Sequence, residues 1–242
     1  MQNFPERTNN YDTNSTATAA KRELVNAFLR GVYWWMTAGL ALTGVMAWLV
    51  YNSPTMQQIV FGNQMVFIGF IIAEVGLVFF LSARIQRLAG STATFLFMVY
   101  SALNGATFSV FLMAYTMPSV ATVFFITAGT FGATSLYGMV TKRDLTSLGG
   151  FCMMGLIGVI IASIVNLFMQ NPMVYMIISY VGVIVFVGLT AYDTQRLRVM
   201  GESVPADDPE AVRRGTIMGA LTLYLDFINL FIMLLRIFGD RR

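Results

Sequence analysis

The sequence predicts an all-α fold, a polytopic membrane protein built as a bundle of seven transmembrane helices. The first observation behind this prediction is composition: 57 % of the 242 residues are hydrophobic and only 11 % are charged, with a mean hydropathy of +0.68. Soluble domains carry about one quarter charged residues. The second is the length of the apolar stretches, which at about twenty residues each match a hydrocarbon core of about 30 Å.

Seven such stretches follow one another along the chain, joined by short loops. They cover residues 31–51, 65–83, 94–115, 121–140, 148–168, 173–191 and 217–237. The last is preceded by Asp208, Pro209 and Glu210. An N-cap Asp, a Pro at the first position and an acid in the first turn together predict that this helix begins at Pro209, before it enters the membrane.

The first thirty residues are polar and contain no apolar core of the signal-peptide kind. We expect residues 1–30 to form a short, disordered cytoplasmic tail. Residues 31–242 are expected to form one transmembrane domain, with no separate soluble domain. The first span then serves as its own targeting signal.

Small residues at helical spacing predict where the spans pack, because close backbone approach holds helices together in lipid. These residues are Ser101, Gly105 and Ser109 in the third span, Ala128 and Gly132 in the fourth, and Gly158 and Ala162 in the fifth. Asn104 and Asn166 are expected to make interhelical hydrogen bonds.

The basic residues predict the topology, because Lys and Arg collect in cytoplasmic loops. They precede the first span and follow the second, the fourth and the sixth, whereas the loops 52–64, 116–120 and 169–172 hold none. The N-terminus is therefore expected in the cytoplasm. Arg236, Arg241 and Arg242 break the pattern. Either the last segment crosses against the charge bias, which we favour, or it turns back within the membrane.

Several function classes are excluded by residue types. The chain has no histidine, which rules out a Ser–His–Asp hydrolase, a His-ligated haem and a His-containing zinc site. A single cysteine, Cys152, permits no intrachain disulfide. The basic residues are spread over short loops, so nucleic acid is not an expected partner, and no cofactor is expected.

Two acids lie well inside apolar spans, Glu74 in the second and Asp226 in the seventh, and Asp193 lies where the sixth span ends. An ionised acid at the bilayer centre costs about 3 kcal/mol on insertion scales. Asp226 should therefore face the bundle interior and be protonated or paired. Its partner is either a second carboxylate that shares one proton or an Arg from a neighbouring helix end.

Two segments around these acids resemble a known family. GLTAYDTQ (residues 188–195) and LYLDFINLFIMLLRIFG (residues 223–239) look like the signature stretches of the Bax-inhibitor family, the transmembrane Bax inhibitor motif proteins. The resemblance runs from Tyr33 onward and is greatest to bacterial members. It implies a bundle with the C-terminal helix at its centre, in the bacterial inner membrane, with no enzymatic activity.

The resemblance also implies a pH-sensitive calcium leak, in which Asp193 and Asp226 form a proton-sharing pair that gates the passage of Ca²⁺. It implies that an Arg at the end of the second helix latches the pair; Arg84 matches best, and Arg87 competes with it. Two adjacent carboxylates cannot both ionise cheaply, so they share a proton. Loss of that proton leaves an oxygen-rich, negative site that suits transient binding of a hard divalent cation.

Helix geometry raises one difficulty for this pair. If each span is centred in the bilayer, the depths of Asp193 and Asp226 differ by something like 10–15 Å, at about 1.5 Å per residue. The pair then requires the sixth helix to sit lower, or the seventh nearer the cytoplasm, than centring suggests.

Each site residue also has a structural interpretation. Asp226 could be a protonated acid bonded to a backbone carbonyl or an Asn, and Asp193 could cap a helix end or pair with Arg196 or Arg84. Glu74 could line the same pore or bond Ser or Asn across helices. Asn229 and Tyr224 could hydrogen-bond near Asp226 and line the pore, or simply pack.

Two other functions are compatible with a polytopic chain. A regulatory membrane protein could bind a membrane-anchored ATP-dependent protease or a stress-response partner through the polar tail. An intramembrane aspartyl protease of the presenilin type would also use two acids, but glycines should precede the second one. Leu223, Tyr224 and Leu225 stand there instead, which disfavours this function.

Overall fold

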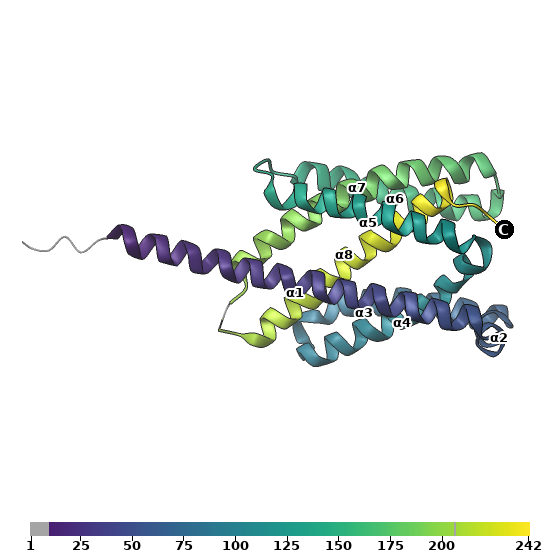
Figure 1. The fold of residues 1–242 in the computed structure, drawn as a ribbon, viewed down its shortest axis with the longest axis horizontal. Helices are drawn as coiled ribbons and strands as arrows, with labels where there is room; N and C mark the ends of the chain where they lie inside the picture. Colours follow the sequence, from purple (N-terminus) through teal and green to yellow (C-terminus); the bar gives the residue numbers. More distant parts are fainter. Residues whose placement is uncertain (1–9, 206) are drawn as a thin grey trace, which may run out of the picture.

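The structure is a computed structural model that describes residues 10–205 and 207–242. Within these ranges the chain folds into eight α-helices and one 3₁₀ turn: α1 (Asn10–Asn52), α2 (Pro54–Phe61), α3 (Gln64–Arg84), η1 (Ile85–Arg87), α4 (Gly90–Ala114), α5 (Met117–Val140), α6 (Thr146–Met169), α7 (Pro172–Ser203) and α8 (Pro209–Phe238) (Figure 1). Seven of the helices, all but α2, are long and apolar enough to cross a membrane, and η1 extends the span formed by α3. The predicted all-α, seven-span fold is confirmed.

Side-chain caps begin several of these helices. Asn171 accepts hydrogen bonds from the backbone N–H groups of Met173 and Val174, and α7 starts at the next residue, Pro172. Asp208 caps α8 through the N–H of Ala211, as its sequence predicts. Before α6, Asp144 accepts bonds from the hydroxyl and the N–H of Thr146, and these bonds lower the pKa of its carboxyl group.

The N-terminal segment differs from the expected disordered tail. Residues 1–9 lie outside the described residues, but residues 10–30 are helical and continue into the first span as one helix, α1. Phe28 in this segment is 5 % exposed. Its ring lies against Gly201 of α7 and Gly215 of α8, so an apolar contact with two distant helices orders a segment whose composition is polar.

Helix α8 occupies the centre of the bundle and is covered by α1, α4, α5 and α7. In its most apolar 18-residue window 72 % of the residues are buried, against 6–39 % in the other six spans. Helix α3 is the opposite case, with 6 % buried, and its principal long-helix neighbour is α4. The central position of the C-terminal helix is therefore confirmed.

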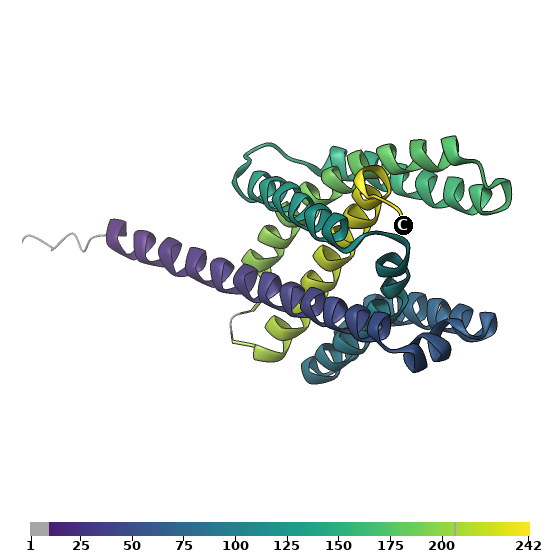
Figure 2. The same ribbon diagram turned by 45° about the vertical axis from the view of Figure 1, so that its right-hand side comes forward.

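The last helix runs the full length of the bundle. Beyond its end, the N–H of Thr116 donates to the carbonyl of Asp240 at 3.0 Å, and the N–H of Arg242 donates to the carbonyl of Ala114 at 3.0 Å. This bridge ties the C-terminal residues to the α4–α5 turn, opposite the α7–α8 linker (Figure 2). We call the two ends of the bundle the C-terminal end and the linker end. The predicted full crossing fits this path better than a turn back within the membrane.

The small residues contribute to packing only in part as predicted. A Cβ on Gly105 would lie 2.5 Å from the carbonyl oxygen of Thr43, so α4 and α1 are in close contact there. The predictions for Gly132 and Gly158 are wrong, because a Cβ on either would meet nothing within 4 Å. The α5–α7 contact lies one and a half turns further on, at Gly138, whose Cβ would come 2.3 Å from the Ala191 carbonyl oxygen.

Candidate functional site

The structure brings Asp193 of α7 and Asp226 of α8 together inside the bundle. They are 8 % and 5 % exposed, and their carboxyl groups lie close enough to influence each other. Both helices are regular at these positions. The meeting of the two side chains therefore depends on how α7 and α8 are aligned rather than on a local distortion.

Two glycine contacts define this alignment. A Cβ on Gly182 would lie 2.9 Å from the Met233 side chain, and a Cβ on Gly219 would lie 2.7 Å from Leu197. The helices are thus antiparallel, and Asp193 and Asp226 both fall between these two contacts. Interpolation between the two contacts offsets the acids along the helix axes by about one helical turn, or about 5.4 Å. Carboxyl side chains can bridge this distance.

The expected mismatch in depth does not arise, because the sixth span is longer than its apolar stretch. The sequence predicted an end near Ala191, but α7 continues to Ser203. Asp193 therefore lies ten residues inside a helix rather than at its end, and it does not cap a helix terminus. The residues that follow it form further helical turns, in which Thr194 bonds to α5, Leu197 contacts α8 and Gly201 contacts α1.

The chemical surroundings of the pair are poor in compensating groups. Oδ2 of Asp226 is buried and has no hydrogen-bond partner among the described residues. Arg196, one turn beyond Asp193 on α7, is the positive group that interacts with that carboxyl. A buried carboxylate without a donor is strongly disfavoured, so this arrangement suits a pair that carries a proton or a bound cation.

Helix α5 forms the adjoining wall. The hydroxyl of Thr194 donates to Ser135 at 3.3 Å, and Arg198 donates to the backbone carbonyl of Met139. Together with the close approach of Gly138 to Ala191, these contacts hold α7 against α5 on both sides of Asp193. Helices α5, α6 and α8 all pack against α7 and together determine the position of this acid.

The structure does not bring the predicted latch to the pair. Arg84 ends α3 and is exposed, as is Arg87 in η1. Within residues 10–205 and 207–242, neither side chain forms an ion pair or hydrogen bond with Asp193 or Asp226. The packing of α3 explains this, since it lies against α4 rather than α7.

Glu74 and Tyr224 belong to a different polar network. Glu74 accepts hydrogen bonds from Thr107 at 2.8 Å and from Asn104 at 3.4 Å. The Tyr224 hydroxyl donates to Asn104 Oδ1 at 3.1 Å and lies 2.6 Å from the Thr43 hydroxyl. The network links α1, α3, α4 and α8 and confirms the interhelical bond expected for Asn104.

The two other asparagines of the sequence analysis form hydrogen bonds close to their own positions in the chain. The amide of Asn229 donates to the carbonyl of Leu225 on its own helix. Asn166 accepts a bond from the N–H of Asn171 at the α6–α7 turn, so the expected interhelical bond is wrong. Thr43 is a network residue that the sequence analysis missed. A hydroxyl in an apolar span was the available signal, but many threonines bond only to their own helix.

The pair offers only part of a calcium coordination shell. Within the described ranges, no group of three or more Cys, Asp or Glu side chains could hold a metal ion. Calcium takes about six to eight oxygen ligands. An ion that passed this point would therefore keep much of its water and bind the two carboxylates only transiently.

Comparison with known proteins connects this architecture with a family. The family model for inhibitors of apoptosis-promoting Bax1 (Bax1-I) matches residues 25–242. The chain is 50 % identical over 228 residues to the inner membrane protein YbhL of Escherichia coli K12, covering 94 % of this chain and 97 % of that one. It is also 43 % identical to an uncharacterized protein of Borreliella burgdorferi, with 93 % and 97 % covered. An uncharacterized protein of Deinococcus radiodurans is 42 % identical, with 90 % and 92 % covered.

Proposed function

Because the chain belongs to the Bax-inhibitor family of membrane proteins, we propose that it is a pH-sensitive calcium leak gated by Asp193 and Asp226. The observation that carries the proposal is the proximity of these two buried acids between α7 and the central helix α8. The proposal is supported further by Oδ2 of Asp226, which is buried and has no hydrogen-bond partner among the described residues.

The closed state in this mechanism is the protonated one. A single shared proton lets one carboxyl donate to the other and halves the charge that must be buried. The contact then holds α7 and α8 together at the middle of the bundle. Loss of the proton creates two adjacent negative charges, which repel each other and separate the helices while attracting a divalent cation. Calcium flux should therefore rise with pH.

Calcium flux into proteoliposomes tests this mechanism. Purified protein is reconstituted around a calcium-sensitive dye, and flux is measured at steps from about pH 5 to pH 8, because a coupled pair releases its protons in two separate steps. Asp193→Asn and Asp226→Asn should each remove the pH dependence, because an amide cannot release the proton. Asp207→Asn, in the exposed linker between α7 and α8, is the matched control and should behave like the wild type. Undiminished, equally pH-sensitive flux in both pair variants would overturn the proposal.

The same experiment separates this function from an intramembrane aspartyl protease, which would also need both acids. Liposomes that contain only this protein hold no peptide substrate. Flux that depends on the pair under those conditions therefore belongs to the protein's own pore. Cleavage of an added helical substrate by the wild type but not by Asp226→Asn would support the protease instead.

Arg84 is proposed to latch the pair in a further closed conformation. The support is the loose packing of α3, whose most apolar window is 6 % buried, because such a helix can shift at low cost. Arg84→Gln should raise calcium flux at low pH, whereas Arg87→Gln, which tests the competing candidate for the latch, should leave it unchanged. Equal flux from both variants and the wild type would remove Arg84 from the mechanism.

We further propose that the protein lies in the bacterial inner membrane with its N-terminus in the cytoplasm. The name of the Escherichia coli relative supports the membrane, and the Lys and Arg residues of the loops support the orientation. In a Cys152→Ser background, a cysteine at Lys142 and one at Arg242 should react with an impermeant thiol reagent from opposite sides of the membrane. Labelling of both from one side would contradict this orientation.

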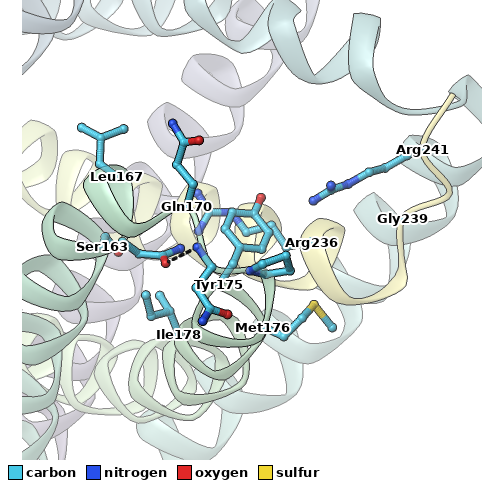
Figure 3. Close-up of a pocket in the computed structure, with 12 residues that line it drawn as sticks. Ser163, Leu167, Gln170, Tyr175, Met176, Ile178, Arg236, Gly239 and Arg241 are labelled. Carbon is cyan, nitrogen blue, oxygen red and sulfur yellow. Dashed lines mark hydrogen bonds between the residues drawn. The ribbon is translucent and has the colours of Figure 1, made fainter.

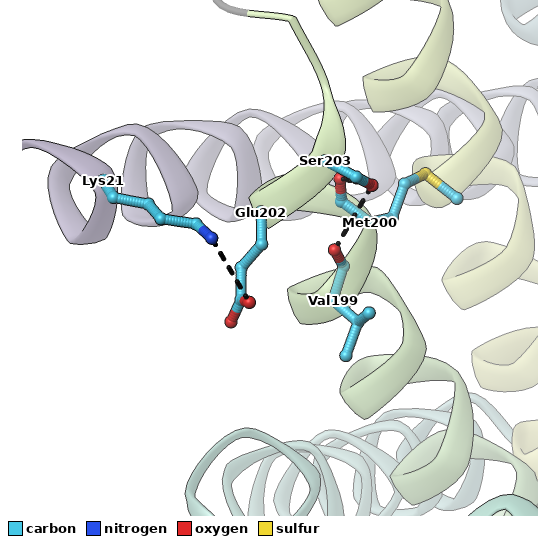
Figure 4. A network of polar contacts seen from close by, with 5 residues as sticks. All are labelled: Lys21, Val199, Met200, Glu202 and Ser203. Atoms are coloured by element: carbon cyan, nitrogen blue, oxygen red, sulfur yellow. Dashed lines mark hydrogen bonds and ion pairs between the residues drawn. The ribbon is translucent and has the colours of Figure 1, made fainter. Parts of the chain in front are cut away.

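A second proposed role is regulation of a membrane-anchored ATP-dependent protease or stress-response partner. The start of α1 projects beyond the other helices and offers a surface for such a partner (Figure 1). Further along α1, Lys21 forms an ion pair with Glu202 of α7 at 3.9 Å (Figure 4). Deletion of residues 1–20 should leave calcium flux intact and abolish copurification of the partner, whereas loss of flux would argue against a separate role for this segment.

A further inference from the structure

Two arginines at the C-terminal end of the bundle lack acidic partners. The described residues contain two ion pairs, Lys21–Glu202 and Arg214–Asp208, and both lie at the linker end. Arg236 in the last turn of α8 and Arg241 beyond it take part in neither. The nearest acid along the chain, Asp240, uses its backbone rather than its carboxylate in the contacts that hold this segment.

The two guanidinium groups converge on one aromatic ring. That of Arg236 lies 4.6 Å from the centre of the Tyr175 ring, and that of Arg241 lies 5.5 Å from the same centre. Arg241 also lies 5.8 Å from the centre of the Tyr115 ring, and a hydrogen bond with the Tyr115 side chain raises its pKa further. Stacking on tyrosine faces holds the cations in place but does not saturate their N–H donors. The Nε atom of Arg236 is buried and has no hydrogen-bond partner within the described ranges.

These arginines line a cavity of about 710 Å³ between α6, α7 and the C-terminal residues. Figure 3 shows Arg241 extending toward Tyr175, with Arg236 and Gln170 close to the same ring. The first turn of α7, with Pro172, also lines this space, so the positive end of a helix dipole points into it. Two cations, a helix N-terminus and an amide therefore surround one space, and the lining contains no acid.

The other wall of the cavity is apolar and open to the lipid side. Leu167, Met176 and Ile178 contribute to it, and Leu167 is 72 % exposed. A cavity with cationic donors at the bundle end and an apolar opening along α6 matches an amphiphile that has an anionic head and a hydrocarbon chain. Its place at the end of the membrane-spanning helices is the depth of lipid headgroups.

We propose that this cavity binds a phosphate group, that of a phospholipid in the adjacent leaflet. Phosphate has several oxygens around one centre, so both guanidinium forks can bind it together, each through paired hydrogen bonds. The apolar wall favours the lipid over inorganic phosphate, which has the same head chemistry. The site also accounts for two of the three arginines that break the charge pattern of the loops, Arg236 and Arg241. It is separate from the aspartate pair, and the proposal does not depend on the calcium leak.

Lipid retention during purification tests the site. Protein in detergent is incubated with phosphatidylglycerol or with diacylglycerol of the same chains, which lacks the phosphate, and bound lipid is counted by native mass spectrometry. The wild type should retain phosphatidylglycerol and not diacylglycerol. Arg236→Gln/Arg241→Gln should retain at least about fivefold less, since hydrogen bonds to charged groups contribute most of such binding.

Arg242→Gln is the matched control, because it removes one charge at the same end outside the cavity lining. Arg242 bonds instead to the Tyr51 hydroxyl. The single variant Arg241→Gln alters only an exposed side chain, so its partial loss of lipid reports on the site even if the double variant folds poorly. Equal retention by the double variant, or by diacylglycerol, would overturn the proposal.

A thermal-shift arm distinguishes the two sources of phosphate. Sodium phosphate is compared with sodium chloride at equal ionic strength. If inorganic phosphate raises the unfolding midpoint of the wild type but not of the double variant, and phosphatidylglycerol is not retained, the assignment to a lipid is wrong and the ligand is free phosphate. A lipid-specific site should show retention without a comparable shift from inorganic phosphate.

Discussion

Asp226 shows how one residue acquires its properties from the helix around it. Its neighbours on the buried face of α8, Leu223, Phe227 and Leu230, are among the least exposed residues of the chain. Water cannot solvate a carboxylate there, so the proximity of Asp193 determines which protonation states are accessible. A single acid at this place would have to stay neutral, whereas a pair can exchange a proton or a cation.

Gly138 lets α5 approach α7 closely on either side of Asp193, and its substitution should be harmful. In Gly138→Ala the new methyl group would meet the Ala191 carbonyl oxygen at 2.3 Å, and a backbone atom cannot rotate away. We expect the free energy of unfolding to fall by about 1–3 kcal/mol, the usual cost of overpacking. The measurement is the thermal unfolding midpoint of the purified protein.

Gly132→Ala provides the control on the same helix, because nothing lies within 4 Å of its added Cβ. Alanine favours helix over glycine by about 0.5–1 kcal/mol, so this variant should match or exceed the wild type. A loss of stability equal to that of Gly138→Ala would show that the α5–α7 contact is not the cause.

At the scale of the elements, α4 illustrates a helix that another helix caps. The residue before it, Ala89, has no side-chain acceptor. Glu210, in the first turn of α8, fills this role by accepting a 2.6 Å hydrogen bond from the N–H of Gly90. Arg213, one turn later, donates to the Thr94 hydroxyl at 3.2 Å. The two helices are therefore joined at the linker end by polar contacts as well as by packing.

Removal of this cap should loosen the end of α4. Glu210→Ala leaves the N–H of Gly90 without its acceptor and should cost about 1 kcal/mol, as for other helix N-caps. Asp207→Ala, three residues earlier in the exposed linker, is the control and should leave the unfolding midpoint unchanged. If both variants unfold at the same temperature as the wild type, the Glu210 bond contributes no net stability.

In the whole molecule, the other helices surround α8, and α3 is the least buried of them. Local stability should therefore decrease from the centre of the bundle to its periphery. Amide hydrogen exchange in nanodiscs is expected to be slowest in the middle of α8. Among the seven spans it should be fastest in α3, the least buried. Lipid shields α3 and α4 alike from water, but α4 is better packed. The exchange rate of α4 is therefore the internal reference for that of α3. Exchange in α3 as slow as in α4 would contradict this order.

The central position of the aspartate pair means that a change in its protonation can affect the packing of several helices. A contact at the centre of the bundle couples α7 to α8, and α8 touches four other helices. If α7 and α8 separated at this point, the packing of most other helices would change. A similar contact between α3 and α4 would affect only the periphery.

Much of this protein follows from local sequence. Seven apolar stretches of sufficient length predict the spans, and the capping residues Asp208 and Pro209 predict where the last helix begins. These features depend on short-range chemistry: hydrocarbon thickness, helix rise and the hydrogen bonds of the first turn. The two acids could likewise be identified in isolation, because a carboxyl group in an apolar stretch is costly wherever it lies.

The contacts between helices required the folded chain. Composition suggested a disordered segment before Arg30, but Phe28 packs against two glycines from helices more than 170 residues away. Centring each span separated Asp193 from Asp226, whereas the alignment of Gly182 with Met233 and of Gly219 with Leu197 brings them together. Side-chain complementarity between distant segments determines such alignments, and hydropathy carries no information about it. For this reason the acids could be predicted from local chemistry, but their depth relative to each other could not.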